Sequence, residues 1–540
     1  MEKDSPIRKL KVLALTGRAA ESIIRANIPK NVLVKVLPID VAAFITREFI
    51  LENITKNEAM KYDLILVPGF VQGDLTELKN ILGVPVVKGP RYASDIKLAL
   101  KELTLSEFSS KYSADKFIQT KKYSETKDLL NYGFNSPLEK QKSEFTLGLE
   151  NQFLVGLDRP ALVMAEIIDA PKMTIDQIKD RVKYFLKYGA NIIDIGVIAK
   201  SPQPKKIFKI ISELQKLKEI HHFIISIDTL NVEEIVAAIE AKVDLILSID
   251  HGNINDLIDK IPNETGIVFL PTNIKDGYMP KAPEERVKSL IKLRDKLQKA
   301  GFTKLFADPI IEMPIYPGFA SSLESYILFR KKDQRTPMMT CIGNVTEFIE
   351  ADPIGINVLF GCLAVELGIQ LLLMTDYSVK CRGGIKEIVK ARDLAFAAKQ
   401  RKAPPKGHGI NILMAKSKTD LELEIPIHKD LEIIDLKFAD ANLYSMDYEF
   451  DPKGSFTIWI DYYKQKIYVV HMSINSKKPD LLFISSNARM IIEEIQKRGL
   501  LSKLDHAIYM GRELERAEIC LYLGKTYIQN EQAFKESELY

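Results

Sequence analysis

Eight short apolar runs recur between residues 155 and 400, separated by stretches with the length and spacing of helices. Such alternation of buried strands and amphipathic helices predicts consecutive strand–helix units in a parallel sheet. Eight units in about 245 residues match the number and length of a (β/α)8 barrel. We therefore predict an α/β chain with a central (β/α)8 barrel over residues 153–402. Its strands are expected at Leu162–Ile167, Ile192–Val197, Ile224–Ile227, Leu245–Ile249, Ile267–Leu270, Leu305–Ala307, Met338–Ile342 and Ile369–Met374.

Helices are predicted between these strands, among them Ile175–Tyr188, Val232–Ala241, Pro283–Ala300 and Ile354–Leu367. Gly189, Gly301 and Gly368 each follow a helix just before a strand, where a left-handed C-cap is expected. The apolar segment 356–374 has the length of a membrane span, but its glycine and polar residues favour a buried helix, a turn and a strand.

The first segment, residues 1–105, is expected to be a small parallel α/β domain of the Rossmann or flavodoxin type. The turn Thr16-Gly17-Arg18 after its first strand leaves two interpretations open: an anion held on backbone amides, or a simple tight turn. The strands are predicted at Lys11–Leu15, Val32–Leu37, Leu64–Val67 and Val84–Val87. The helices are predicted at Ala19–Ala26, Val41–Asn53, Asp74–Ile81 and Ser94–Leu103.

Residues 106–152 are rich in Ser, Lys and Glu, and we interpret them as a partly helical linker. After the stretch RKAPPKGHG, residues 405–540 are predicted to form a C-terminal α/β domain. Alternating apolar residues indicate a hairpin of Phe456–Asp461 and Lys466–His471, followed by a strand and two helices.

The composition excludes several classes of protein. The 76 basic and 72 acidic residues leave a net charge of only +4, which gives no reason to expect nucleic acid as a partner. Four cysteines without CxxC spacing fit a reducing compartment rather than a disulfide framework. The N-terminal apolar stretch is too short for a signal peptide, so we expect a cytoplasmic protein without a membrane partner.

In a (β/α)8 barrel the working groups lie at the C-terminal ends of the strands. Each predicted strand here ends in at least one polar side chain, and most deliver a carboxylate. The groups in chain order are Glu166, Asp169, Asp194, Asp228, Ser248, Asp250, His251, Thr272, Asn273, Asp308, Asn344 and Asp376, followed by Lys380 and Arg382.

Carboxylates in a narrow pocket can bind a metal, act as acids or bases, or accept hydrogen bonds from an amino-substituted ring such as a pterin. His251 beside Asp250 is one possible metal-binding pair, but no HxH or HxxE element supports it, so no metal ligand is assigned and metal use stays open. Lys380 and Arg382 suit a phosphate or diphosphate. Singly, Asp194 and Asp308 have an equally simple interpretation as structural braces.

The stretches YGANIIDIGVIAKSPQP, IISIDTLNVEEIVAAIEAKVDLILSID and FADPI resemble the pterin-binding barrel of dihydropteroate synthases and methyltetrahydrofolate–corrinoid methyltransferases. With SVKCRGG after the last strand, the chain is most similar to archaeal dihydropteroate synthase-related proteins. The resemblance implies that Asp228 and Asp308 hold the pterin, and that Ser248 stands where the family has Asn, with Asp250 as a substitute. We assign pterin binding to Glu166, Asp194, Asp228, Ser248, Asp250, Asp308 and Asn344.

The sequence departs from the synthase pattern in three loops. The synthase motifs after strands one, two and seven are replaced by MAEIID, AKSP and IGNVT. The synthase's usual Arg and Lys are therefore missing, and we assign phosphate binding to Lys200, Lys380 and Arg382, with the last two also catalytic. The element Gly343-Asn344-Val345-Thr346 instead resembles a methyltransferase motif whose Asn contacts the pterin.

The segment HAIYMGRELERAEICLYLGKTYIQ resembles a domain in one subunit of the tetrahydromethanopterin S-methyltransferase complex, which hints at a corrinoid. Three functions follow from these resemblances. The first is condensation of a dihydropterin-methyl diphosphate with an arylamine in folate or methanopterin-type biosynthesis. The second is methyl transfer between a tetrahydropterin and a corrinoid protein, and the third is pterin binding without catalysis. A homodimer is left open.

Overall fold

The structure is a computed structural model that describes residues 10–138, 144–150, 152–416, 450–474, 476 and 478–534. Its contacts divide the chain into two units, Met1–Tyr132 with Gln400–Asn411, and Gly133–Lys399 with Ile412–Tyr540. The division differs from the sequence-based boundaries, because the predicted linker 106–152 is shared between the two units.

The first unit contains a four-stranded parallel sheet in the order β2-β1-β3-β4. Alternate residues of β1 point to opposite faces of this sheet, and both faces are covered. Leu13 and Leu15 pack against the side of α2, α3 and α4, whereas Val12 and Ala14 pack against the side of α1 and α5. The strands are β1 (Val12–Thr16), β2 (Val32–Val36), β3 (Leu64–Val67) and β4 (Val86–Lys88). The helices are α1 (Glu21–Arg25), α2 (Arg47–Asn53), α3 (Lys56–Ala59), α4 (Leu78–Leu82) and α5 (Ile96–Glu102).

The single helix predicted over 41–53 is wrong in its length. A short 3-10 turn, Ala42–Phe44, comes first, and the backbone at Ile45 is extended. Thr46 then caps α2, because its hydroxyl accepts a hydrogen bond from the backbone N–H of Phe49 at 3.2 Å. A Thr N-cap with extended backbone starts a new helix rather than continuing an old one.

The predicted linker, residues 106–152, contains the expected helical structure and also part of a hairpin that the sequence analysis did not predict. These residues contain the 21-residue helix α6 (Asp115–Asn135) and the strand β5 (Phe145–Leu147), which pairs with β6 (Phe153–Val155) in an antiparallel hairpin. This hairpin contributes to the core inside the barrel, where the ring of Phe145 lies 5.5 Å from that of Phe306. Sequence periodicity missed the hairpin because each strand has only three residues.

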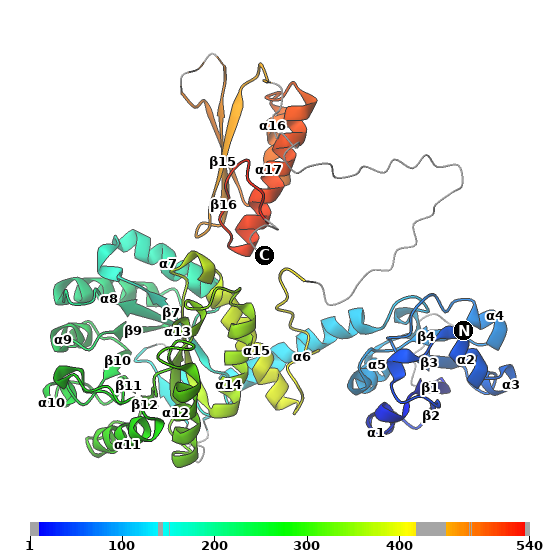
Figure 1. The fold of residues 1–540 in the computed structure, drawn as a ribbon, viewed down its shortest axis with the longest axis horizontal. Coiled ribbons are helices and arrows are strands. Elements are labelled where there is room, and N and C mark those ends of the chain that lie inside the picture. The colour runs from blue at the N-terminus through cyan, green and yellow to red at the C-terminus, as the bar shows by residue number, and fades with distance from the viewer. Residues whose placement is uncertain are drawn as a thin grey trace. The chain divides into compact units, whose positions relative to one another are not determined.

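The second unit contains the predicted barrel. Eight parallel strands close in the order β10-β11-β12-β13-β14-β7-β8-β9, and helices surround them (Figure 1). The prediction of a (β/α)8 barrel is confirmed. The strands are β7 (Leu162–Ile167), β8 (Ile192–Gly196), β9 (Ile224–Asp228), β10 (Leu245–Ile249), β11 (Gly266–Phe269), β12 (Leu305–Ala307), β13 (Met338–Cys341) and β14 (Ile369–Thr375).

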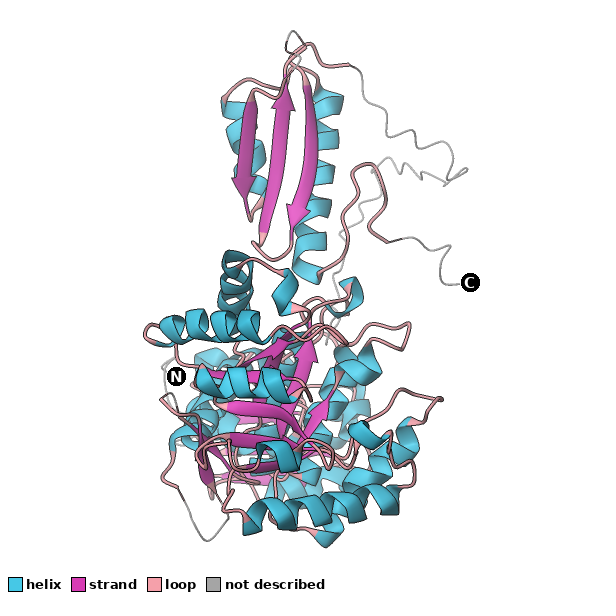
Figure 2. Cartoon of the chain, turned by 90° about the vertical axis from the view of Figure 1, so that its left-hand side faces the viewer, coloured by secondary structure: helices cyan, strands magenta, loops and turns pink. Residues whose placement is uncertain are grey.

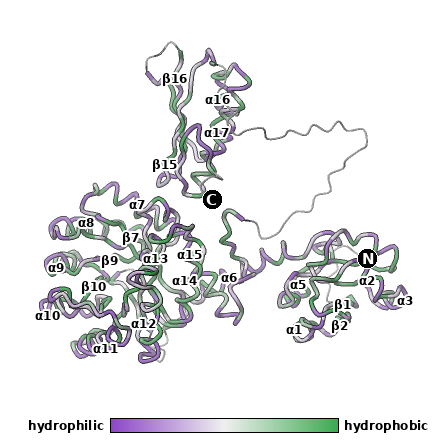
Figure 3. Tube along the Cα trace, in the orientation of Figure 1, coloured by the Kyte–Doolittle hydropathy of each residue, from purple (hydrophilic) through white to green (hydrophobic). Residues whose placement is uncertain are grey.

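Most of the barrel helices alternate polar and apolar residues, as α8 and α11 do in Figure 3. Gly189, Gly301 and Gly368 have the predicted positive φ angles of 94°, 98° and 68°. The segment 356–374 forms all of α14 except its first two residues, the Gly368 turn and most of β14. The helices are α7 (Ile175–Lys187), α8 (Pro204–Lys218), α9 (Val232–Glu240), α10 (Ile254–Leu257), α11 (Pro283–Lys299), α12 (Phe319–Lys332), α13 (Gly343–Thr346), α14 (Ile354–Leu367) and α15 (Gly384–Gln400).

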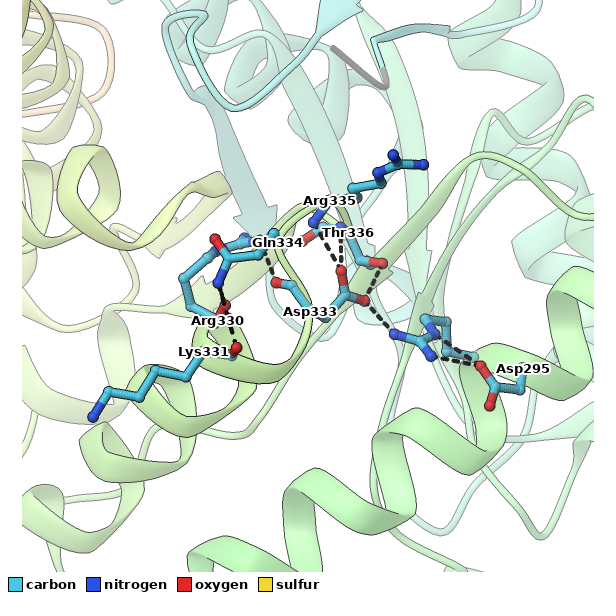
Figure 4. Close-up of polar contacts among 8 residues, drawn as sticks. Asp295, Arg330, Lys331, Asp333, Gln334, Arg335 and Thr336 are labelled. Atoms are coloured by element: carbon cyan, nitrogen blue, oxygen red, sulfur yellow. Dashed lines mark hydrogen bonds and ion pairs between the residues drawn. The ribbon is translucent and has the colours of Figure 1, made fainter. Parts of the chain in front are cut away.

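The N-terminal end of β13, opposite the expected site, is held by a polar network (Figure 4). Asp333 accepts from the backbone N–H groups of Arg335 and Thr336 and forms an ion pair with Arg294 at 2.6 Å. Arg330 donates to the carbonyls of Leu367 and Thr336, and so joins the turns that precede two neighbouring strands. Polar groups at this end of a barrel serve stability.

The C-terminal domain is a three-stranded antiparallel sheet with two helices packed on it, as Figure 2 shows. Its strands are β15 (Ser455–Asp461), β16 (Lys466–Met472) and β17 (Leu481–Ser485), and its helices are α16 (Ala488–Lys497) and α17 (Leu504–Leu523). The predicted hairpin is present, and a strand and two helices follow it as expected. Among the described residues, no helix is both long and apolar enough to cross a membrane.

Candidate functional site

Three carboxylates converge at the C-terminal end of the barrel. Glu166 of β7 is a register neighbour of Asp194 in β8, and Asp228 ends β9 beside Gly196. One carboxylate oxygen of each acid lies within 4.8 Å of the others. A Cβ at Gly196 would lie 2.8 Å from Oε1 of Glu166, so glycine provides the space that this side chain occupies. We call Glu166, Asp194 and Asp228 the carboxylate trio.

Asp194 is the deepest member of the trio. It is fully buried, and its Oδ1 accepts a hydrogen bond of 2.5 Å from the hydroxyl of Ser226 in β9. Its Oδ2 is also buried and accepts no hydrogen bond from any side chain or backbone group in the described part of the chain. A buried carboxylate oxygen without a partner is costly as an anion, so this atom needs a proton, a cation or a donor from a ligand.

Burial and mutual repulsion raise the pKa values of the trio. Burial, with a smaller contribution from the charges of Asp228 and Glu347, raises the pKa of Glu166 to about 8. Burial and the charge of Asp308 raise the pKa of Asp228 to about 6. The pKa of Asp194 is raised as well, by burial first and then by the two neighbouring acids. At neutral pH Glu166 therefore carries a proton, and the pocket can donate as well as accept.

Asp308 and Asn344 complete the other side of the mouth. Asp308 follows β12, and its Oδ1 accepts from the hydroxyl of Tyr326 at 2.9 Å and from the backbone N–H of Ile310 at 2.7 Å. Burial raises its pKa to about 6. Asn344 lies in α13, and its Nδ2 donates to the carbonyl of Ile311 at 3.0 Å. This bond fixes the orientation of the amide and leaves Oδ1 as the outward acceptor.

Asp250, one of the residues predicted to bind pterin, has hydrogen-bond donors at both carboxylate oxygens. Its Oδ1 accepts from the backbone N–H groups of Gly252 and Asn253, and its Oδ2 accepts from the Thr272 hydroxyl and the N–H of Ile274. Four hydrogen bonds fill the acceptor positions of a carboxylate. Asp250 therefore joins the loops after β10 and β11. Ser248, 6% exposed, forms backbone hydrogen bonds to Thr229 and to the Asn253 side chain.

The three predicted phosphate ligands do not meet in one place. Lys380 donates to the carbonyl of Glu347 at 2.9 Å and to that of Ile349, and so holds the loop after α13. The guanidinium of Arg382 lies 5.7 Å from the ring centre of Tyr462 in the C-terminal domain. Lys200 is exposed in the loop after β8. Within the described part of the chain, no hydrogen bond or ion pair joins Lys200, Lys380 or Arg382 to the carboxylate trio.

The tip of the β15–β16 hairpin lies against the rim of the barrel. Tyr463 donates to the carbonyl of Asp376, directly after β14, at 3.0 Å, and the Arg181 guanidinium is 3.2 Å from the Tyr463 ring centre. Tyr184 of α7 donates to the hydroxyl of Tyr462 at 2.9 Å. Burial raises the pKa of Asp376 to about 6. This aromatic contact covers the outer edge of the β14 end, next to the strand that carries Glu166.

The trio can hold either of two kinds of ligand. Oxygen atoms within 4.8 Å of one another can coordinate a divalent cation, for which carboxylates are suitable ligands. The same oxygens can accept hydrogen bonds from the N–H groups of a ring, with Asp308 and Asn344 opposite. Both ligands would satisfy the unpartnered Oδ2 of Asp194.

The sequence analysis did not identify three residues that donate hydrogen bonds to the predicted site carboxylates or shift their pKa values. Ser226 and Tyr326 are buried donors to Asp194 and Asp308, and Glu347 acts on Glu166 through its charge. The alternation of side chains along β9 could have indicated Ser226, because it lies two residues before Asp228 and faces the same side. Tyr326 lies within the long helix α12, and its sequence position carries no such signal.

Comparison with known protein families gives three matches along the chain. Residues 168–314 match the family described as "Pterin binding enzyme". Residues 10–91 match a family of unknown function, DUF6513, and residues 450–530 match the family PterinBD-DUF4346.

Relatives and solved structures were also found. The uncharacterized protein MJ0107 of Methanocaldococcus jannaschii is 34% identical over 541 residues, which is 97% of this chain and 99% of that protein. The Ycf91-like protein of Nostoc sp. is 29% identical over 127 residues, or 19% of this chain and 99% of that protein. Dihydropteroate synthase from Xanthomonas albilineans with 7,8-dihydropteroate is 19% identical over 46% of this chain and 95% of its own, with a TM-score of 0.34. The Yersinia pestis dihydropteroate synthase in complex with a sulfonamide drug is 15% identical. The match covers 48% of this chain and 100% of that chain, with a TM-score of 0.36.

Proposed function

The chain belongs to the same family as the uncharacterized archaeal protein MJ0107, and we propose that its barrel binds a reduced pterin and transfers a group from it. The match of residues 168–314 to pterin-binding enzymes supports this proposal at the level of ligand class. The choice of residues and of reaction depends on the geometry of the barrel mouth.

The observation that carries the proposal is the grouping of acceptors at that mouth. Asp228 ends β9 and Asp308 directly follows β12, three strands further around the barrel, and each retains acceptor capacity. The amino-pyrimidine edge of a pterin presents several N–H donors in one plane, which carboxylates accept well. In this proposal Asp228 and Asp308 accept these N–H bonds, and Oδ1 of Asn344 accepts another.

The role of Glu166 follows from its protonation. With a pKa of about 8 it is a carboxylic acid at neutral pH, and it lies next to Asp228 at the floor of the mouth. A general acid works best when its pKa is close to the operating pH. We assign to Glu166 the protonation of the pterin nitrogen from which the group departs. Asp194, which the Ser226 hydroxyl holds in place, is a positioning residue for Glu166 in this proposal.

The contacts of the basic residues favour methyl transfer over diphosphate displacement. A departing diphosphate needs cations, and Lys380 and Arg382 are engaged with carbonyls and with Tyr462. A methyl group needs only a proton on its donor. The carbon leaves N5 of the tetrahydropterin without the bonding electrons, the acceptor supplies the pair for the new bond, and the pair left on N5 takes the proton of Glu166. A corrinoid protein is the acceptor that we propose.

The synthase reaction remains a second candidate because of the 4.8 Å spacing of the trio. A divalent cation bound there would supply the positive charge that the basic residues do not bring to the mouth. This alternative requires that Glu166 release its proton to solvent when the cation binds. Methyl transfer requires that Glu166 hold its proton until N5 takes it, so the two reactions make opposite demands on one side chain.

The test uses the full-length chain with a methylated tetrahydropterin and a reduced corrinoid, and measures loss of the methylated pterin. Glu166→Gln keeps the shape of the side chain without its acidic proton and should slow transfer by about 10²- to 10⁴-fold while pterin affinity is retained. Glu350→Gln, an exposed change in the loop beyond α13, is the matched control and should have no effect.

Two outcomes would decide against methyl transfer. One is a wild-type rate in Glu166→Gln, and the other is no corrinoid-dependent demethylation by the wild type. If the wild type instead releases diphosphate from a dihydropterin-methyl diphosphate in the presence of an arylamine and magnesium, the synthase candidate is correct. Tight pterin binding with neither reaction would indicate a binding protein.

A further inference from the structure

The N-terminal unit has a cavity of about 230 Å³ that is separate from the barrel. It lies at the C-terminal ends of β1 and β3, and its wall includes Thr16, Val67 and Gly89. The sheet order is β2-β1-β3-β4, so the chain leaves β1 toward one edge and later returns to its other side at β3. In parallel sheets this point of reversal is where ligands bind, outside the carboxyl ends of the strands.

The lining is apolar, and part of it faces solvent. Ile23, Val41 and Phe70 line the cavity and are 46%, 46% and 39% exposed. These three apolar side chains form an exposed apolar patch around the opening of the cavity, and such patches are typical of ligand-binding sites. Gly69 keeps the floor close-packed, since a Cβ there would lie 2.5 Å from the carbonyl oxygen of Gly89.

Arg91 brings a positive charge to this apolar wall. Its Nε is buried and has no hydrogen-bond partner among the described residues. Its guanidinium carbon lies 5.7 Å from the ring centre of Phe70. The backbone N–H of Arg91 donates to Asp115 at 3.1 Å, which fixes the position of the residue. An arginine in the wall of an apolar cavity is suited to the carboxylate of a ligand, because its guanidinium can form charge-assisted hydrogen bonds with both carboxylate oxygens.

We propose that this cavity binds a small aromatic monocarboxylate, with the ring among the apolar side chains and the carboxylate on Arg91. A cavity of about 150 Å³ accommodates benzene, so 230 Å³ accommodates one ring with a carboxylate and a further substituent. A nucleotide would need more volume and a phosphate site. The proposal does not depend on the function of the barrel.

The turn Thr16-Gly17-Arg18 does not provide such a phosphate site. A Cβ at Gly17 would lie 2.8 to 2.9 Å from backbone atoms of Ile39, Asp40 and Ala42, so the glycine is required by chain packing. Arg18 is exposed and forms an ion pair with Asp40 at 3.0 Å. The tight-turn interpretation of this motif accounts for these contacts.

The test is ¹⁹F NMR of 4-fluorobenzoate with the full-length protein, and 4-fluorobenzyl alcohol is the uncharged probe of similar size. We expect saturable line broadening for the acid and binding weaker by about tenfold or more for the alcohol, because a charge-assisted hydrogen bond is lost. Arg91→Ala should weaken binding of the acid to a similar extent. Ala19→Phe, at an exposed position of the lining, should block entry without disturbing the core.

Two controls separate this site from others. Arg18→Ala removes a nearby arginine outside the cavity and should bind the acid like the wild type. Asp228→Asn should also retain binding, which would place the probe outside the barrel. The proposal is wrong if the acid does not bind at millimolar concentration, or if both Arg91→Ala and Ala19→Phe bind it normally. It is also wrong if adenosine monophosphate binds at this site and the acid does not.

Discussion

Replacement of Glu166 by Gln should stabilise the free protein at alkaline pH and have little effect at acidic pH. In the unfolded chain this carboxyl ionises near its ordinary pKa of 4.5, whereas in the folded barrel burial and neighbouring carboxylates raise the pKa to about 8. Between these values the folded state binds more protons than the unfolded state. The free energy of unfolding therefore falls as pH rises from about 4.5 to 8, and Glu166 adds no further change above that range.

The magnitude follows from the same pKa. A rise in the pKa of Glu166 from 4.5 to about 8 corresponds to a loss of roughly 5 kcal/mol in the free energy of unfolding at a pH where Glu166 is ionised in both the folded and the unfolded state. Glu166 is only partly buried, and solvent screening reduces this figure, so we expect about 2 to 3 kcal/mol. Glu166→Gln removes this loss, because the amide never ionises. The variant should match the wild type at pH 5 and exceed it by that amount at pH 9.

The assay is urea unfolding followed by far-UV circular dichroism at pH 5, 7 and 9, with Glu350→Gln as the control. The control should follow the wild type at all three values. A gain in Glu166→Gln that is the same at pH 5 and pH 9 would refute the reasoning, because it would not depend on ionisation. A variant less stable than the wild type at pH 9 would refute it as well.

Three further perturbations test other parts of the account. Ser226→Ala leaves Oδ1 of the buried Asp194 without its donor and should lower the free energy of unfolding at pH 7 by about 1 to 3 kcal/mol, measured in urea; an unchanged value would contradict this contact. Asp333→Ala removes a carboxylate that pairs with Arg294 and accepts from the backbone N–H groups of Arg335 and Thr336 at the opposite end of the barrel, while Asp295 still pairs with Arg294. It should cost about 1 to 3 kcal/mol in the same assay, with pterin affinity unchanged. Lys380→Met loses two hydrogen bonds to carbonyls and should lower the melting temperature while methyl transfer stays within a few-fold of wild type; a loss of transfer at retained stability would return Lys380 to a catalytic role.

The barrel could be predicted from sequence because its signal is local and repeated. Each strand is a short apolar run, and Gly189, Gly301 and Gly368 mark the ends of three helices with the expected backbone. The placement of Glu166 and Asp228 at the mouth followed from the rule that strand ends converge there, and the structure brings their oxygens together with that of Asp194. These inferences needed no knowledge of contacts between distant segments.

The sequence does not show which of the predicted site residues already have hydrogen-bond partners within the chain. Lys380 looked available for an anion, but it is held by carbonyls more than 30 residues earlier in the chain. Asp250 resembled Asp228 in its position after a strand, yet the following Gly252 and Asn253 supply backbone N–H groups to it. The sequence Asp250-His251-Gly252-Asn253 is one in which an Asp side chain accepts from backbone N–H groups of the following turn.

The most direct test of the central claim is the dissociation constant of a reduced pterin, such as 6-methyltetrahydropterin, measured by isothermal titration calorimetry for the wild type and Asp228→Asn. The claim that mouth carboxylates accept the pterin N–H groups predicts weakening by about 10- to 100-fold in the variant, the range of a lost charge-assisted hydrogen bond. Asp256→Asn, an exposed carboxylate in α10, should bind like the wild type. Equal affinities for the wild type and Asp228→Asn, or no binding by either, would contradict the claim.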